Sequence, residues 1–466
     1  MRFALLGIAL VLGACSPSNP TAGEDGAEVR RSAAAPACAS PLFRSIHAAA
    51  IKVADKGSVP LALMTVASSI ARPEAAVGEE IVWPRIADEI ANAEYEVSLQ
   101  TYSLTTDSEP YKHVLRGLER LAQRRQQAGA KEPVVVRMLV STSTVAAGSS
   151  GLPTTIMPAL AASLDGLHID PVLVRFELGA FMHVGLGSLH SKTVVIDGRS
   201  AAVMSGNLGK AAERNGAFFF EGPVARSILA ELDQGWSESY LWTCGADRFK
   251  GLTDCSLQNA LPEHRLPAVE GPSGCRPMLV ATRKASANPF SNDTKNPQDQ
   301  AFLAAMANAK ERIRVITPNL NDDAAKAGLV GAMKRGVDVE IVLAKEYEEF
   351  TESLPGQGGT NLPNVKKVLE QLRAAGVASP CDRFKLRWYS SDCKVPLSGN
   401  VPGAEHLKYM SVDGQVAIVG SANMDTQSWN KEREINVAVD DAATTKAWDD
   451  GVFAKDFDSG IPACPQ

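Results

Sequence analysis

Two short stretches of the chain carry the same ionisable side chains in the same order. The first reads H-S-K-T-V-V-I-D-G from position 190, and the second reads H-L-K-Y-M-S-V-D-G from position 406. Both follow the pattern H-x-K-x4-D-G, and similar tails, M-S-G-N and G-S-A-N, come after them. The shared residues are His190, Lys192, Asp197, Ser205 and Asn207 in the first copy and His406, Lys408, Asp413, Ser421 and Asn423 in the second. A single copy would be weak evidence, whereas two copies with matching tails indicate a repeated site.

The spacing of these residues predicts their local geometry. Alternate side chains of a strand share a face, so the histidine and the lysine of each copy point the same way. Asp-Gly after a β-branched run predicts a two-residue hairpin turn. If Ile196 pairs with Arg199 across that turn, His190 lies opposite Ser205, and the same count places His406 opposite Ser421. Each asparagine then falls on the face of the histidine and lysine.

Such a patch suits a phosphodiester. The lysine supplies positive charge, and the serine and asparagine donate hydrogen bonds to the non-bridging oxygens. Two patches together provide one histidine to attack phosphorus and another to protonate the leaving alkoxide. This scheme requires no metal and no cofactor.

The paired motifs resemble those of the phospholipase D superfamily. The resemblance implies two similar lobes that meet at one active site within a single chain. It also implies that His190 attacks phosphorus to form a phosphohistidine and that His406 protonates the leaving group. The stretch from Glu221 to Ala225 resembles the bacterial cardiolipin synthase and phosphatidylserine synthase branch.

The same resemblance implies a carboxylate downstream of each motif that orients the histidine of the opposite half. Glu434 is our choice for His190, and Asn215, with Glu221 as an alternative, for His406. The two motif aspartates, expected in turns, would order the hairpins. Met204 stands where the second copy has glycine, and we expect it to reshape that side of the pocket.

The rest of the chain predicts an α/β fold of two similar lobes. In each half a helix, a strand, a helix and a strand follow one another, which indicates a mixed, mostly parallel sheet flanked by helices, with the active site between the lobes. Ala-Asn-Ala at 91–93 returns at 307–309, and this offset of 216 positions also separates the two motif histidines. A duplicated domain explains both observations.

The expected domain boundaries follow from composition. Residues 1–15 resemble a bacterial lipoprotein signal, with Cys15 as the lipidation site, and residues 16–40 form a flexible tether. We place the first phospholipase D-like domain at 41–260, a linker at 261–300 and the second domain at 301–466. The expected product is an exported lipoprotein at the outer membrane or periplasmic face. The irregular stretch 347–363 is either a loop over the active site or a surface excursion.

Because disulfides form in exported proteins, we expect the remaining seven cysteines to form disulfides. Short spacings favour Cys244 with Cys255 and Cys381 with Cys393, and one cysteine must be left over. The pairing of the others stays open; they are Cys38, Cys275 and Cys464.

Charge and composition limit the substrate. The net charge is −6 and aromatic residues make up 6% of the chain, which makes nucleic acid an unlikely partner. A basic cluster at Arg120, Arg124 and Arg125 lies at a helix end, where a solvated face is expected. The leading hypothesis is therefore a phosphodiesterase that acts on phospholipid head groups at a membrane surface. An exported nuclease of the same superfamily and an inactive lipid-anchored binding protein are the alternatives.

Overall fold

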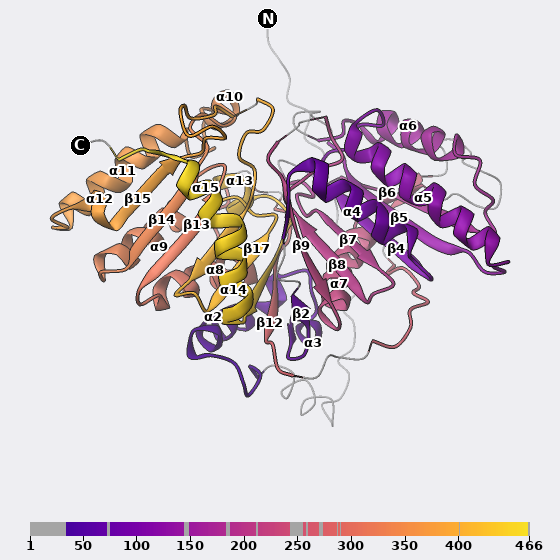
Figure 1. Ribbon diagram of the computed structural model, residues 1–466, viewed down its shortest axis with the longest axis horizontal. Helices are drawn as coiled ribbons and strands as arrows, with labels where there is room; N and C mark the ends of the chain where they lie inside the picture. The colour runs from indigo at the N-terminus through magenta and orange to yellow at the C-terminus, as the bar shows by residue number, and fades with distance from the viewer. Residues whose placement is uncertain are drawn as a thin grey trace, which may run out of the picture.

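The computed structural model describes residues 34–71, 75–143, 149–182, 187–210, 213–242, 255–257, 260–269, 274–286, 288, 290–399 and 401–464. Cys15 and Cys244 lie outside these residues, so the expected lipidation site and the Cys244–Cys255 pairing do too. The described chain forms two lobes side by side, each a sheet with helices on its outer surface (Figure 1). No helix within the described ranges combines the length and apolar character needed to cross a membrane.

The first lobe contains a ten-stranded sheet. Its strands, in spatial order, are β11 (Cys255–Leu257), β10 (Tyr240–Trp242), β6 (Val174–Phe181), β5 (Val134–Ser141), β4 (Glu96–Thr101), β7 (Thr193–Ile196), β8 (Ser200–Met204), β9 (Gly216–Glu221) and β2 (Ile70–Ala71), with β3 (Ala76–Val77) also paired to β9. Its helices are α4 (Glu79–Ala91), α5 (Glu109–Gln127), α6 (Pro153–Asp165) and α7 (Val224–Ser237).

The second lobe contains a nine-stranded sheet. Its strands, in spatial order, are β1 (Thr65–Val66), β12 (Met278–Arg283), β18 (Glu434–Asp440), β17 (Val416–Gly420), β16 (Tyr409–Val412), β13 (Arg312–Thr317), β14 (Asp338–Leu343), β15 (Phe384–Trp388) and β19 (Ile461–Pro462). The helices around it are α2 (Pro41–Ile51), α3 (Leu61–Met64), α8 (Pro297–Asn308), α9 (Asp323–Lys334), α10 (Glu349–Glu352), α11 (Asn361–Ala374), α12 (Pro380–Arg383), α13 (Thr426–Asn430), α14 (Ala442–Trp448) and α15 (Ala454–Ser459).

The two sheets share one topology. The order β6-β5-β4-β7-β8-β9 in the first lobe recurs as β15-β14-β13-β16-β17-β18 in the second. The predicted two-lobed α/β fold is confirmed. Parallel pairing, however, is confined to the first three strands of each series, and the motif strands β7 and β16 join β4 and β13 in antiparallel fashion.

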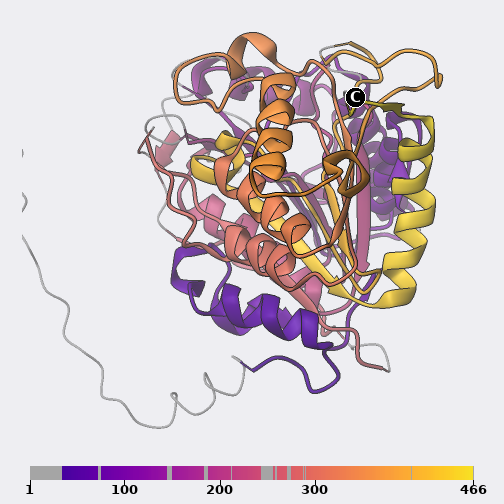
Figure 2. The same cartoon turned by 90° about the vertical axis from the view of Figure 1, so that its left-hand side faces the viewer.

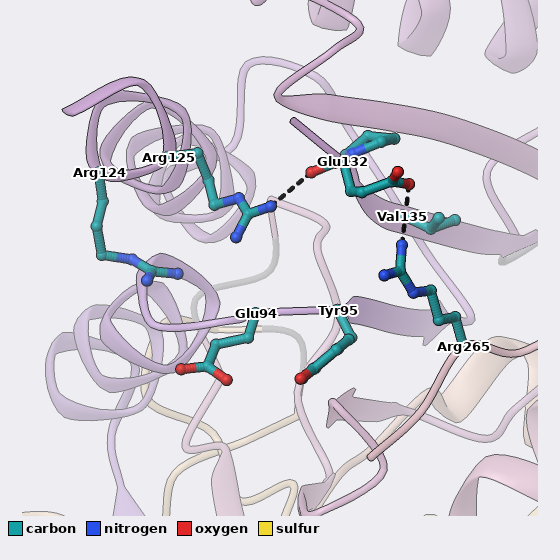
Figure 3. Close-up of a pocket in the computed structure, with 8 residues that line it drawn as sticks. Glu94, Tyr95, Arg124, Arg125, Glu132, Val135 and Arg265 are labelled. Carbon is teal, nitrogen blue, oxygen red and sulfur yellow. Dashed lines mark hydrogen bonds and ion pairs between the residues drawn. The ribbon is translucent and has the colours of Figure 1, made fainter. Parts of the chain in front are cut away.

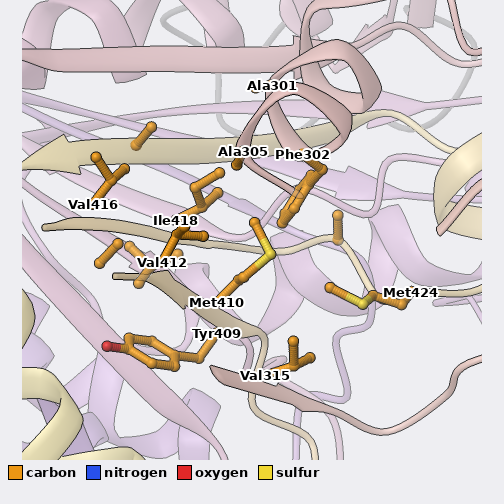
Figure 4. Close-up of a cluster of buried hydrophobic side chains, with 14 of the residues drawn as sticks. Ala301, Phe302, Ala305, Val315, Tyr409, Met410, Val412, Val416, Ile418 and Met424 are labelled. Atoms are coloured by element: carbon orange, nitrogen blue, oxygen red, sulfur yellow. The ribbon is translucent and has the colours of Figure 1, made fainter. Parts of the chain in front are cut away.

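Apolar periodicity places the helices as predicted. In α5, Ser108 caps the first turn by accepting the Tyr111 N–H, and Val114, Leu118 and Leu121 form the buried stripe. In the second lobe, α8 lays Phe302 and Ala305 over side chains of β16 and β17 (Figure 4). One continuous core joins this region to β8, β9 and α7 of the first lobe, so the lobes pack as one body.

The domain boundaries drawn from composition differ from the layout of the sheets. The N-terminal helix α2 packs against α8, and β1 pairs with β12, so residues 41–66 belong spatially to the second lobe. The expected linker contributes β12, which pairs with β18. Figure 2 shows α2 beneath the helices of the second lobe. A segment placed in the first domain by sequence order therefore completes the other one.

Both Asp-Gly turns form, but the strands beyond them pair one residue away from the prediction. Asp197 and Gly198 have φ of 53° and 59°, the left-handed pair of a type I′ turn, and the second turn repeats this geometry. Ile196 pairs with Ser200 because the Arg199 carbonyl instead accepts the Gly222 N–H, at 2.8 Å. The expected pairing of each motif histidine with a serine is therefore wrong by one position.

The disulfide prediction for Cys381 is also wrong. Cys381 is bonded to Cys464, because β19 pairs with β15 and brings the end of the described chain beside α12. Cys38 is bonded to Cys275, and Cys393 is free and exposed. Sequence proximity favoured Cys393, whereas the sheet edge determines the partner.

A buried ion cluster fixes the segment between the lobes onto the first sheet. His264 contacts Glu96 through Nδ1 at 2.7 Å and Asp233 through Nε2 at 2.9 Å. Arg137, 2% exposed, also pairs with Glu96, at 2.8 Å. Although burial opposes it, hydrogen bonding to Asp233 and Glu96 raises the pKa of His264 to about 9.

We expect this histidine to make stability depend on pH. Because its pKa is higher in the folded state than the ordinary 6.5, its contribution is fully present below pH 6.5 and is lost as the pH rises through about 9. The free energy of unfolding should fall by about 3 kcal/mol across this window. His264→Gln should remove that slope in urea unfolding, whereas His113→Gln, on α5, should keep it. Equal slopes in all three proteins would contradict the assignment.

Candidate active site

The two motifs converge where the lobes meet. His190 and His406 precede β7 and β16, are 6% and 3% exposed, and lie within electrostatic range of each other. Lys192 and Lys408 act on both imidazoles. One chain therefore brings both imidazoles and both ammonium groups into a single buried site.

Each imidazole is held by the lobe opposite to its own. His190 Nδ1 donates to Glu434 Oε1 at 2.7 Å, and Glu432 Oε2 lies 3.5 Å from the same nitrogen. Since a carboxylate only accepts, the proton resides on Nδ1 and Nε2 keeps its lone pair. Such an imidazole is oriented for nucleophilic attack.

The second histidine has a weaker acceptor. His406 Nδ1 donates to Asn215 Oδ1 at 2.8 Å, and Glu213 Oε2 lies 3.1 Å away. Asn215 Nδ2 donates to Glu79 at 3.1 Å, which turns the amide oxygen toward the imidazole. Both Glu434 and Asn215 thus occupy the orienting places expected of them. The alternative, Glu221, lies at the far end of β9, paired with Ile70 and Ser200.

Sequence reasoning missed two further carboxylates beside the histidines. Glu432 and Glu213 occupy the same place in related tripeptides, Glu-Arg-Glu at 432–434 and Glu-Arg-Asn at 213–215. The sequence contained a signal for these two carboxylates. The two tripeptides lie 219 positions apart, close to the 216 positions that separate the motif histidines.

The central arginines of these tripeptides tie the lobes together. The Arg433 carbonyl accepts the N–H groups of His190 and Ser191, and its buried guanidinium pairs with Glu231 of α7 at 2.7 Å. Arg214 repeats this arrangement: its carbonyl accepts the His406 N–H, and its guanidinium pairs with Asp456 of α15 at 2.6 Å. Each histidine is thus positioned by backbone and side chain from the other lobe.

Comparisons with known proteins show similarity to phospholipid-synthesising enzymes. Residues 302–456 match the family model described as "Cardiolipin synthase, PLD-like domain". Cardiolipin synthase A of Pseudomonas fluorescens is 26% identical over 55% of this chain and 45% of its own length. Residues 302–456 thus carry a PLD-like domain similar to that of cardiolipin synthases. Cardiolipin synthase A of Klebsiella pneumoniae is 30% identical over 31% of this chain and 25% of its own.

A solved phospholipase D fold covers most of the chain. Phosphatidylserine synthase of Haemophilus influenzae superposes with a TM-score of 0.55 over 84% of this chain and 88% of its own, at 12% identity. This likeness concerns the fold. The chain spans less than half the length of the curated relatives named above.

The other motif residues occupy distinct positions around the two histidines. Each lysine is buried and donates to the carbonyl of its own histidine, two residues earlier. The carboxylate of Asp197 accepts three backbone N–H groups, from residues 94–96, and Asp413 does the same with residues 310–312. The aspartates therefore fix each turn to the neighbouring strand, away from the imidazoles.

The serines support the orienting residues. Ser205 Oγ donates to Asn215 Oδ1 at 3.3 Å, and Ser421 Oγ donates to Glu434. Asn423, 7% exposed, donates through Nδ2 to Asp425 at 2.8 Å, and its Oδ1 has no partner among the described residues; Asn207 Oδ1 is likewise buried without one. The atom left without a partner on each asparagine is an acceptor, whereas the expected role on a phosphate oxygen requires a donor.

Met204 does not reshape the pocket as expected. It is 2% exposed within the core of the first lobe and pairs with Ala217. Gly420, the equivalent residue of the second lobe, pairs with Asn436, and a Cβ added to Gly420 would clash with Asn436 Oδ1. Each lobe thus pairs one small residue with one larger residue, and the two positions are exchanged between the lobes.

Burial and charge repulsion keep both imidazoles neutral. Burial lowers the pKa of His190 to about 3, with Glu432 opposing this and both lysines adding to it. Burial and the two lysines also lower the pKa of His406. A bound phosphodiester anion would offset the lysine charges and would therefore favour protonation of a histidine.

One group of described side chains could hold a metal ion, namely His190, Glu432 and Glu434, whose ligand atoms lie within 4.8 Å of one another. The imidazole atom facing both carboxylates is Nδ1, which already donates to Glu434. A divalent cation there would replace that proton and compete with the orienting hydrogen bond.

A surface pocket of about 280 Å³ lies elsewhere, among Glu94, Tyr95, Arg124, Arg125, Glu132 and Arg265 (Figure 3). Two of its arginines are bound to neighbouring residues. Arg124 donates to the Ala91 carbonyl at 2.9 Å, and Arg265 pairs with Glu132, also at 2.9 Å. The basic cluster singled out in the sequence therefore packs α5 onto its surroundings and lies by the Asp197 turn, at the opposite end of β7 from His190.

Proposed function

We propose that this protein is a phospholipase D-type phosphodiesterase that acts on phospholipid head groups through a phosphohistidine. The observation that carries the proposal is the crossed pair of imidazoles, each with Nδ1 held by the opposite lobe and each beside a buried lysine. The relationship to cardiolipin synthases supports a phospholipid substrate. We also propose that the enzyme works at a membrane surface, where lipidated Cys15 would hold it.

In the first step, His190 Nε2 attacks phosphorus and forms a P–N bond, while the bond from phosphorus to the head-group oxygen breaks. His406 supplies the proton for the leaving alkoxide. Lys192 and Lys408 stabilise the charge on the equatorial oxygens of the transition state. The Glu434 carboxylate stabilises the positive charge that develops on the attacking imidazole.

In the second step, neutral His406 removes a proton from water or from an alcohol, whose oxygen then attacks phosphorus and releases His190. Water gives hydrolysis, and an alcohol gives phosphatidyl transfer. The same residue thus serves as acid and then as base.

The test is turnover by the purified protein, with EDTA present, on vesicles of phosphatidylglycerol, phosphatidylcholine or phosphatidylethanolamine beside single-stranded DNA. We expect release of lipid head groups that His190→Ala abolishes, and an added alcohol should divert product into a new phospholipid. Cleavage of DNA with inert lipids would instead identify an exported nuclease. Inertness toward all substrates would favour the inactive binding protein.

A further inference from the structure

A cavity of about 470 Å³ lies where the stretch between β12 and α8 meets residues 55 and 56, and we call it the β12 cavity. Its volume is within the range of small-molecule sites. Four of the residues that line it are basic and two are acidic, in a chain whose net charge is −6. The cavity therefore concentrates positive charge and suits an anionic ligand. The basic residues are Lys56, Arg283, Lys284 and Lys295, and the acidic residues are Asp55 and Asp293.

Arg283 brings hydrogen-bond donors to the cavity that the protein does not use. Its side chain is 5% exposed, and Nη1 donates to the Asp293 carbonyl at 3.3 Å and to Asp299 Oδ2 at 3.2 Å. Neither Nε nor Nη2 has an acceptor among the described residues. Burial raises the pKa of Asp299 to about 7 although Arg283 opposes this, so the carboxyl balances the guanidinium only in part at neutral pH. A buried guanidinium with unused N–H groups requires a further acceptor.

The side chains around Arg283 are also free to bind an anion. Within the described part of the chain, Lys284 and Lys295 have no carboxylate at ion-pair distance, and Lys56 contacts only its exposed neighbour in the chain, at 3.5 Å. The hydroxyl oxygens of Ser286 and Ser291 accept backbone N–H groups and keep their own protons to donate. Guanidinium, ammonium and hydroxyl donors together match the oxygens of a phosphate group.

A hydrophobic side chain beside the cavity indicates a membrane lipid as the source of that phosphate. Phe290, which directly precedes Ser291, is 87% exposed, more than any other large hydrophobic side chain among the described residues. An exposed aromatic ring beside basic side chains is typical of proteins that lie on a bilayer interface. Arg283, the last residue of β12, pairs with Glu434, which holds His190. A bilayer docked here would therefore lie at the end of the sheet beside the active site.

We propose that the β12 cavity binds the phosphate of an anionic membrane phospholipid and that Phe290 enters the bilayer interface beside it. The cavity is separate from the catalytic groups, so the bound lipid is a docking partner and the inference does not depend on the reaction proposed above. The phosphate of phosphatidylglycerol is not balanced by an ammonium group. It therefore fits the excess of basic residues in the cavity better than the zwitterionic head group of phosphatidylcholine does.

The test measures binding to vesicles of phosphatidylcholine, with and without phosphatidylglycerol. The protein is the full chain with Cys15→Ser, so that no attached lipid contributes. Lys284→Gln with Lys295→Gln removes two charges from the cavity, whereas Arg283 is kept because it is buried against an acidic partner and its replacement would disturb the fold. We expect this double variant to bind the vesicles with phosphatidylglycerol about 30-fold more weakly, a loss of about 2 kcal/mol.

Two further variants separate the cavity from general effects of charge and apolar surface. Lys366→Gln with Lys367→Gln removes the same charge from the exposed face of α11, and vesicle affinity should change less than about threefold. Phe290→Ala should weaken vesicle binding about tenfold. It should leave the binding of inorganic phosphate, measured by calorimetry at constant ionic strength, unchanged. Thermal unfolding confirms that each variant is folded.

Three outcomes would overturn the inference. Equal losses in the two lysine pairs would show a diffuse attraction to the vesicle surface. Full vesicle binding by Phe290→Ala would exclude the contact of its ring with the bilayer. Saturable binding of inorganic phosphate without any binding to vesicles would identify free phosphate as the ligand. Because no turnover is measured, vesicle binding that depends on the cavity in a protein without catalysis would defeat only the proposed function.

Discussion

The His406→Ala variant is expected to release one equivalent of p-nitrophenolate from a p-nitrophenyl phosphodiester and then stop. This leaving group departs without a proton, so the missing acid does not prevent attack by His190. Hydrolysis of the phosphohistidine still needs His406 as base, and the intermediate should accumulate. The His190→Ala variant should show no burst, because it lacks the nucleophile. On phospholipids both variants should lose at least about 10³-fold of turnover.

The burst is measured by rapid mixing, and the covalent adduct by its acid lability and its mass on the peptide that contains His190. His113→Ala, a substitution on the outer helix α5, is the matched control and should behave as wild type. A burst in His190→Ala with none in His406→Ala would reverse the roles. Bursts in both variants would remove the phosphohistidine from the mechanism.

The expected roles follow from an asymmetry within an otherwise symmetric site. The tripeptides that hold the two imidazoles differ at one position, where the second half has Glu434 and the first half has Asn215. A carboxylate stabilises the charge that an attacking imidazole acquires, and an amide stabilises it less. On the proposed mechanism, duplication supplies two equivalent histidines, and a single side-chain difference would give them different tasks.

Local signals in the sequence predicted the order helix, strand, helix and strand in each half. In the first lobe these elements are α4, β4, α5 and β5, and in the second they are α8, β13, α9 and β14. Asp-Gly placed both turns correctly, because only residues that tolerate positive φ fit there. These features depend on neighbours within a few positions, which a sequence displays directly.

Features that depend on distant partners were not predictable in the same way. The hairpin register shifted because the Arg199 carbonyl bonds Gly222, a residue beyond the next strand. Cys381 is bonded to Cys464 because β19 pairs with β15. Helix α2 lies with the second lobe because it packs against α8. The orienting role of Glu434 came from family resemblance, since no local rule connects it with a histidine 244 positions away.

Replacing Glu434 with glutamine should reduce kcat by about 10²- to 10⁴-fold with little change in KM. The amide can present its NH₂ group to Nδ1, which favours the tautomer with the proton on Nε2 and removes the attacking lone pair. Even in the correct tautomer, the charge on phosphorylated His190 would lose the nearer of its two buried carboxylates, with Glu432 remaining 3.5 Å from Nδ1. Urea unfolding at pH 7 separates this loss from damage to the fold, since Glu434 is fully buried.

The reciprocal variant, Asn215→Asp, tests whether the difference at this position assigns the roles. A second carboxylate beside His406, in addition to Glu213, should raise the pKa of that imidazole and shift the limb of the pH–rate profile that reports its protonation toward higher pH. Turnover at the optimum should change by less than about tenfold, since His406 keeps its acceptor. A loss as large as that of Glu434→Gln would mean that both histidines need identical support, and the asymmetry of the two tripeptides would then have no part in the chemistry.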